Sequence, residues 1–121
     1  MKLLLDTNFW IYVAKYKMFD RLKEMNVELV LIGPVMRELE TLSKVGNDRI
    51  DSSVALEMIK RWNIKSIEVK ERKTDDALLK FASDNKEEIR VATMDRSLSE
   101  RLSRAGVRIM KIRQKRDFLE D

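Results

Sequence analysis

Two aspartates follow apolar segments that are expected to be buried strands. Asp6 comes directly after residues 2–5, and Asp95 comes directly after residues 89–94. In open parallel α/β sheets the functional site lies outside the carboxyl ends of the strands, so both carboxylates are expected at one edge of one sheet. The alternative is a structural role, because Asp is a favoured N-cap residue and each aspartate precedes a predicted helix. For either aspartate taken alone, helix capping is a more frequent reason for an Asp at such a position than a functional role.

Asp95 has a competitor for the capping role. Residues 97–100 read Ser-Leu-Ser-Glu, which matches a capping box. A helix that begins from Ser97 leaves Asp95 with less structural reason to be there. This pattern therefore favours a functional role for Asp95.

A third acid lies on a helix predicted from Pro34 to about residue 45. At about 100° per residue, the apolar side chains of this helix cluster within about 60°: Val35, Leu39 and Leu42. Glu38 then lies about 60° from the middle of that stripe, and Glu40 lies nearly opposite it. A carboxylate at the edge of the core is costly unless it is paired or bound to a metal. The sequence leaves two alternatives for the partner of Glu38: a Lys or Arg side chain, or a metal ion.

The fourth candidate comes from the acidic pair that follows Thr74. In the same projection Asp75 falls on the inner face of a helix predicted over residues 74–85, and Asp76 lies about 100° away. We therefore predict Asp75 as the functional acid, with Asp76 beside it. The alternative is that both complement the helix dipole behind a Thr74 cap.

Four acids at one rim of a sheet should repel one another, raise some pKa values and require a divalent cation. The chain contains neither His nor Cys, which excludes thiolate nucleophiles, Ser-His-Asp machinery and zinc sites built on those residues. A bound metal would be a hard, oxygen-seeking ion such as Mg²⁺ or Mn²⁺.

The composition is that of one folded domain. The chain has 121 residues, of which 44% are hydrophobic and 38% charged, and no apolar run approaches the ~20 residues of a membrane span. We expect a soluble cytoplasmic protein with no membrane partner. The abundance of Lys, Arg and Glu also fits a thermophile.

The charge distribution suggests a polyanionic partner. The net charge is +4, and residues 101–116 contain seven basic residues and no acid. The alternative for this run is a solvated charged face.

Strands and helices alternate along the chain. Strands are predicted over residues 2–5, 27–32, 64–69, 89–94 and 107–112, and helices over residues 8–16, 19–25, 34–45, 48–62, 74–85 and 97–105. This order predicts a three-layer α/β/α sandwich with a central, mainly parallel sheet of about five strands. We assign residues 1–115 to one domain and residues 116–121 to a C-terminal tail, either a disordered end or a docking segment.

The longest predicted helix, residues 48–62, has apolar side chains at four-residue spacing: Ile50, Val54, Met58 and Trp62. This spacing predicts an amphipathic helix.

Four short motifs resemble those of the PIN-domain nucleases. They are Leu-Leu-Asp-Thr-Asn (4–8), Val-Met-Arg-Glu-Leu-Glu (35–40), Asp-Asp-Ala-Leu-Leu (75–79) and Val-Ala-Thr-Met-Asp-Arg (91–96). The first and last are fairly specific in this order and spacing, and the resemblance spans about residues 2–112. Members of this family are small α/β/α proteins that cut single-stranded RNA with Mg²⁺ or Mn²⁺.

The resemblance implies roles for particular residues. The catalytic, metal-binding acids are Asp6, Glu38, Asp75 and Asp95. Four residues border or support them: Thr7, Asn8, Asp76 and Thr93. Basic residues that hold the RNA backbone are Arg96, Arg101 and Arg104. Many members have a further acid two residues beyond the last Asp, and here that position is Ser97, so the resemblance implies a weakened second metal site and an intact first one.

The implied function is metal-dependent hydrolysis of phosphodiester bonds, either in ribosomal-RNA processing or as the toxin of a toxin–antitoxin pair. The implied partners are single-stranded RNA, an antitoxin or a ribosome-assembly protein, and a second copy of the chain bound through exposed Phe9 and Trp10. Two alternatives belong to other classes. One is an inactive PIN-like module that binds RNA or protein; the other is a phospho-acceptor domain, which is disfavoured because only a single acid follows the first strand.

Overall fold

The computed structural model describes residues 1–113 and 117–120. It contains one six-stranded sheet with the strand order β3-β2-β1-β4-β5-β6. The strands are β1 (Lys2–Leu5), β2 (Glu28–Ile32), β3 (Ser66–Ile67), β4 (Ile89–Ala92), β5 (Arg108–Arg113) and β6 (Asp117–Glu120). The first five run parallel, and β6 pairs antiparallel with β5. The carboxyl ends of β1, β2 and β4 therefore meet at one edge of the sheet.

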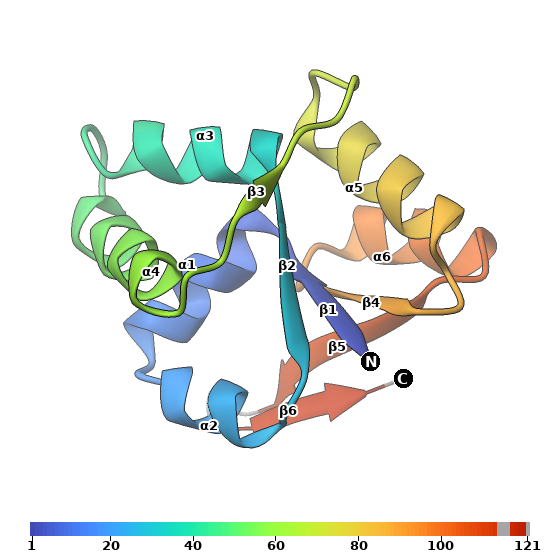
Figure 1. The fold of residues 1–121 in the computed structure, drawn as a ribbon, viewed down its shortest axis with the longest axis horizontal. Coiled ribbons are helices and arrows are strands. Elements are labelled where there is room, and N and C mark those ends of the chain that lie inside the picture. The colour runs from blue at the N-terminus through green and yellow to red at the C-terminus, as the bar shows by residue number, and fades with distance from the viewer. Residues whose placement is uncertain (114–116, 121) are drawn as a thin grey trace.

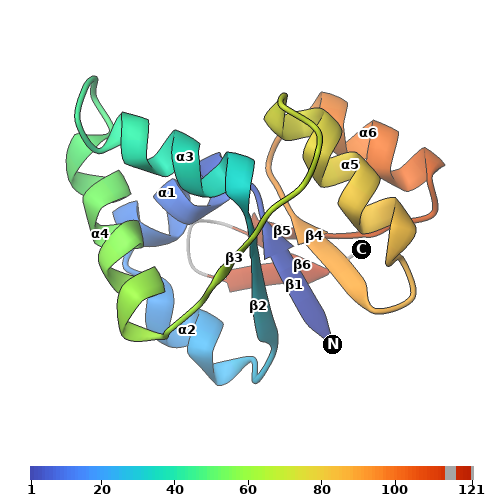
Figure 2. The same cartoon turned by 45° about the horizontal axis from the view of Figure 1, so that its top comes forward.

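Helices cover both faces of this sheet (Figures 1 and 2). They are α1 (Thr7–Lys15), α2 (Phe19–Glu24), α3 (Gly33–Leu42), α4 (Arg49–Arg61), α5 (Thr74–Asp84) and α6 (Arg96–Arg104). Helices α1, α3 and α4 pack against one another, and α5 packs against α6. The predicted three-layer α/β/α fold with a mainly parallel sheet is confirmed.

Strand β1 lies inside the sheet and needs cover on both faces, because its last three residues are all apolar. Leu3, Leu4 and Leu5 are all completely buried, as expected for a parallel strand with helices on each face. Phe9 and Trp10, on the helix that follows, are also completely buried. The expectation that these two side chains are exposed for a dimer is wrong, because α1 uses them to pack into the core.

Helix α4 buries a different face from the four-residue stripe noted in the sequence. Ile50 is 79% exposed and Val54 is 40% exposed, whereas the buried residues are Ser52, Ala55 and Ile59. A four-residue step turns about 400°, so such a stripe drifts by about 40° per step around the helix. The buried residues, with steps of three and four, stay within about 60°.

Residues 117–120, which were predicted to belong to a C-terminal tail, form strand β6. The ring of Phe118 stacks on Phe9, with 5.9 Å between ring centroids. The predicted domain boundary between residues 115 and 116 lies outside the described residues, as do Lys115 and Arg116 of the basic run.

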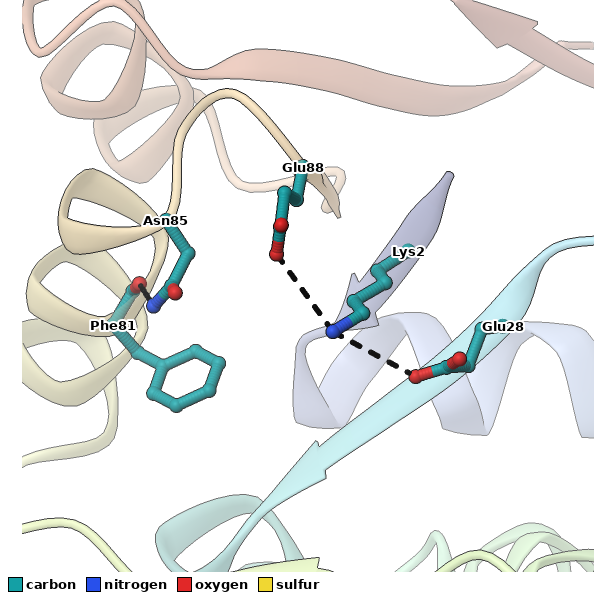
Figure 3. Close-up of polar contacts among 5 residues, drawn as sticks. All are labelled: Lys2, Glu28, Phe81, Asn85 and Glu88. Carbon is teal, nitrogen blue, oxygen red and sulfur yellow. Dashed lines mark hydrogen bonds and ion pairs between the residues drawn. The ribbon is translucent and has the colours of Figure 1, made fainter.

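At the amino edge of the sheet, charged side chains pair with one another (Figure 3). Lys2 Nζ lies 3.7 Å from Glu88 Oε2 and 4.0 Å from Glu28 Oε2. Lys2 thus bridges the entrances to β2 and β4 from its place on β1. Nearby, Asn85 Nδ2 donates a hydrogen bond of 2.8 Å to the carbonyl oxygen of Phe81 at the end of α5. Among the described residues, no helix has the length and apolar character needed to cross a membrane.

Two isoleucines of α4 test which face is buried. Ile59→Ala should lower the free energy of unfolding by about 2–4 kcal/mol, because it opens a cavity at a buried position. Ile50→Ala, a matched change at an exposed position, should alter it by less than about 0.5 kcal/mol. Urea unfolding measures both, and an equal loss in the two variants would contradict the packing described here.

Candidate active site

Asp6 is a buried carboxyl group at the junction of β1 and α1, with 6% of its surface exposed. Its Oδ1 accepts a hydrogen bond of 2.7 Å from the backbone N–H of Phe9, which caps α1. Its Oδ2 accepts a hydrogen bond from the hydroxyl of Thr93. Burial raises the pKa of Asp6 to about 6. The hydrogen bonds from Thr93 and Phe9 oppose that rise, while the carboxylates of Asp75 and Asp95 add to it.

Thr93 connects Asp6 to Asp95. It is completely buried just beyond the end of β4. While its hydroxyl donates to Asp6, the same oxygen accepts a hydrogen bond of 3.0 Å from the backbone N–H of Asp95. The position of one aspartate is therefore tied to the backbone of the other.

Asp95 is the N-cap of α6, and the expected competition from Ser97 is not observed. Its Oδ1 accepts a hydrogen bond of 2.8 Å from the N–H of Leu98, and its backbone carbonyl accepts one of 2.7 Å from the hydroxyl of Ser99. The helix begins at Arg96, one residue before the predicted start, because the Asp95 carboxylate reaches the first turn. Among the described residues, Asp95 Oδ2 has no hydrogen-bond partner, so the cap occupies only half of this carboxylate.

Glu38 reaches the site from the middle of α3. It is exposed, so its predicted place at the edge of the core is wrong. Leu42, one of the three residues used to locate the buried face, is only half-buried, which shifts that face away from Glu38. The partner of Glu38 Oε1 is the hydroxyl of Thr7 on α1, rather than a Lys or Arg side chain. Asn8, the next residue on α1, is exposed.

Asp75 and Asp76 occupy the first turn of α5 but differ in their surroundings. Partial burial raises the pKa of Asp75, and the carboxylates of Asp95, Glu38 and Asp76 add to this rise while Arg101 opposes it. Asp76 instead forms an ion pair with Arg101, with 3.1 Å between Oδ1 and Nη2. The cap residue of α5 is Lys73 rather than Thr74, and its side chain makes no capping hydrogen bond.

Glu38, Asp75 and Asp76 line an open groove of about 830 Å³ between α3 and α5. Asp6 and Asp95 are not among its lining residues. They are nevertheless coupled to the groove, because the charge of Asp75 raises the pKa of Asp6 and the charge of Asp95 raises the pKa of Asp75. The groove also contains four basic residues, namely Arg37, Arg72, Lys73 and Arg101. The first three are not among the residues predicted to form the site, although the position of Arg72 and Lys73 almost directly before the acidic pair was a signal for two of them.

The three arginines predicted to bind RNA do not lie together. Arg101 lines the acidic groove, whereas Arg96 and Arg104 line a separate depression between α6 and β5 that also contains Lys111. Arg96 Nε lies 3.7 Å from Oε1 of Glu100, which is one turn further along the same helix.

The donor chemistry of the site suits a hard divalent cation, because every candidate ligand is a carboxylate oxygen. Among the described residues, no three acidic side chains are arranged to hold one ion as they stand. Each carboxylate has about four acceptor positions, and one or two of these are occupied on Asp6, Glu38 and Asp95 by the hydrogen bonds above. Acceptor capacity for a metal therefore remains on all four acids.

The raised pKa of Asp6 predicts a cost in stability above pH 6. As pH rises from about 4 to 6, the unfolded chain loses the Asp6 proton while the folded chain keeps it, so folding stability should fall by on the order of 2–3 kcal/mol. Asp6→Asn preserves a capping oxygen and should remove this fall. Urea unfolding in EDTA at pH 4 and 7.5 measures it. The exposed Asp20→Asn variant is the control and should behave as wild type, and an unchanged pH dependence in Asp6→Asn would contradict the prediction.

Comparison with known proteins identifies the family. A family model described as "PIN like domain" matches residues 3–115. Ribonuclease VapC4 from Methanocaldococcus jannaschii is 35% identical over 126 residues, covering 97% of this chain and 94% of the relative. A solved structure titled "Structure of the PIN domain endonuclease Utp24" superposes with a TM-score of 0.78 at 22% identity, covering 99% of this chain and 90% of that chain, which shows a shared fold. The resemblance inferred from the four motifs is thereby confirmed, and the chain belongs to the PIN-domain family.

Proposed function

We propose that this protein is a metal-dependent endoribonuclease that hydrolyses phosphodiester bonds of single-stranded RNA. The observation that carries the proposal is the electrostatic coupling among Asp6, Glu38, Asp75 and Asp95 near the carboxyl edge of the sheet. Their mutual repulsion helps raise the pKa of both Asp6 and Asp75. Acids that perturb one another in this way are typical of functional sites. The relative at 35% identity is named a ribonuclease, which supports the substrate class.

Mg²⁺ or Mn²⁺ would be held by Asp6, Glu38, Asp75 and Asp95. When bound, such an ion lowers the pKa of a water molecule and stabilises negative charge on a phosphate. The protein's own residues orient the acids for this task. The Thr93 hydroxyl fixes Asp6, the Thr7 hydroxyl fixes Glu38, and the α6 cap fixes one oxygen of Asp95.

Arg101 has a separate role in the proposed site. It neutralises Asp76 and lowers the pKa of Asp75, so it limits the repulsion within the acidic groove before metal binds. The ion pair also joins α5 to α6, since the two residues lie on different helices. We therefore assign Arg101 to stabilising the ionised form of Asp75 and to joining α5 to α6, which leaves less of its charge for contact with RNA.

The proposal extends to cellular role and partners. The chain acts either in ribosomal-RNA processing with a ribosome-assembly partner, or as a toxin whose activity a protein antitoxin blocks. Growth arrest on expression, abolished by Asp6→Asn, supports the toxin role; growth without arrest despite activity in vitro supports processing. A homodimer would need a surface other than Phe9 and Trp10, which are buried.

Metal binding and cleavage should be lost together when two of the acids are neutralised. Calorimetry should show that wild type binds Mn²⁺, and labelled single-stranded RNA added afterwards should be cleaved. The Asp6→Asn/Asp95→Asn variant should neither bind Mn²⁺ nor cleave the RNA, because two of the four ligands have lost their charge. Circular dichroism checks that the variant is folded. A folded wild type that takes up no Mn²⁺ would contradict the proposal and favour the non-catalytic binding module.

Two glutamates on α3 form a matched pair. Glu38→Gln should reduce cleavage at least tenfold, roughly the loss seen when the support of a metal site is removed. Glu40→Gln makes the same chemical change two residues away, at an exposed position outside the groove, and should leave cleavage unchanged. Initial rates at saturating Mn²⁺ measure both. A larger loss in Glu40→Gln would show that the wrong glutamate has been assigned to the site.

A further inference from the structure

RNA carries a negative charge at every phosphate, and the acids of the groove repel it. Binding therefore needs cations near the acids that are not already neutralised by protein carboxylates. Two of the four basic residues of the groove are engaged in this way. Arg37 Nη1 lies 3.1 and 3.3 Å from the two carboxylate oxygens of Glu68, and Arg101 Nη2 lies 3.1 Å from Asp76 Oδ1.

Arg72 and Lys73 are different. Both line the groove, both are exposed, and neither has an ion-pair partner within residues 1–113 and 117–120. They lie immediately before the first turn of α5, which carries Asp75. The groove thus has two uncompensated positive charges beside its acids.

The segment that carries these two residues is anchored at both ends. At one end Glu68 pairs with Arg37 on α3, and its carboxylate lies against Gly33, where a Cβ atom would collide with it. At the other end the chain enters α5. The Arg72 and Lys73 backbone is therefore held between the helix that carries Glu38 and the helix that carries Asp75.

Other basic residues of the surface are less suited to this task. Lys2, at the opposite edge of the sheet, is shared between Glu28 and Glu88 (Figure 3). Arg96, in the depression beside α6, lies next to Glu100. Neither residue lines the groove that contains the acids.

We propose that Arg72 and Lys73 form a phosphate-binding subsite that holds the RNA backbone next to the bond that is cut. The inference rests on the proposed ribonuclease function and assigns a role to two residues that the acidic site itself does not use. The subsite recognises the charge of a phosphate other than the one that is attacked. A dinucleotide has only the attacked phosphate, so the subsite favours longer substrates.

The test compares two double variants. Arg72→Ala/Lys73→Ala removes the subsite, and Lys65→Ala/Lys70→Ala removes two exposed charges from the same stretch between α4 and α5 but outside the groove. Thermal unfolding checks that both are folded. Cleavage with Mn²⁺ is measured on a short oligouridylate and on the dinucleotide UpU, and binding of the oligouridylate is followed by fluorescence anisotropy in EDTA at increasing salt.

For Arg72→Ala/Lys73→Ala we expect a higher KM and an unchanged kcat on oligouridylate, with unchanged cleavage of UpU. The slope of log affinity against log salt should become shallower by about 1.4, because each phosphate contact with a single strand contributes about 0.7. The Lys65→Ala/Lys70→Ala control should match wild type in every measurement.

Three results would overturn the inference. An equal loss on UpU and oligouridylate would place Arg72 and Lys73 at the attacked phosphate or in the framework of the site. Unchanged KM and salt slope would show that they do not contact RNA, while wild-type cleavage would leave the proposed function intact. A wild type that neither binds nor cleaves oligouridylate would refute the proposed function and the subsite together.

Discussion

The hydroxyl of Thr93 is the contact on which the arrangement of the site depends. It donates to Asp6 at the end of β1 and accepts from the N–H of Asp95 beyond β4, so one buried oxygen sets the relative position of two acids that are far apart in the sequence. Neighbouring parallel strands make this possible, because β1 and β4 are paired and end at the same edge. Helices α1 and α6 then start from these two aspartates. A change at this hydroxyl would therefore affect the acids and the starts of two helices at once.

Capping and chemistry are compatible at these positions, although the sequence presents them as alternatives. A carboxylate has two oxygens, and the cap of α6 takes only one of those of Asp95. Both oxygens of Asp6 accept hydrogen bonds, but each keeps further acceptor capacity. The caps also remove rotational freedom from the side chains, which lowers the entropy lost when a ligand orders them. Structural use of these carboxylates thus prepares them for the proposed metal.

The parts of the site that the sequence predicts are those set by local order along the chain. A strand followed by Asp and then a helix identifies Asp6 and Asp95, because the topology of a parallel sheet places such residues at one edge. The exposure of Glu38 and the buried face of α4 were not predictable in the same way, since helix projections ignore which neighbour a helix meets. Ile50 is exposed because α4 packs through Ser52 and Ala55, whose small side chains allow close approach to α1 and α3. The pairing of Asp76 with Arg101 spans 25 positions and depends on how α5 lies against α6.

Residues 72–76 place opposite charges side by side, and this order has a physical consequence. The acids gain from being close together only when a cation neutralises them, whereas an RNA chain is attracted only by positive charge that remains free. Arg101 and Arg37 are tied to carboxylates, so they contribute to the framework of the groove more than to its external field. Arg72 and Lys73 contribute to that field without moving the acids, because they lie outside α5 and make no ion pair within the described part of the chain. The same short segment can therefore carry one residue for metal and two for RNA, with the start of α5 as the boundary between them.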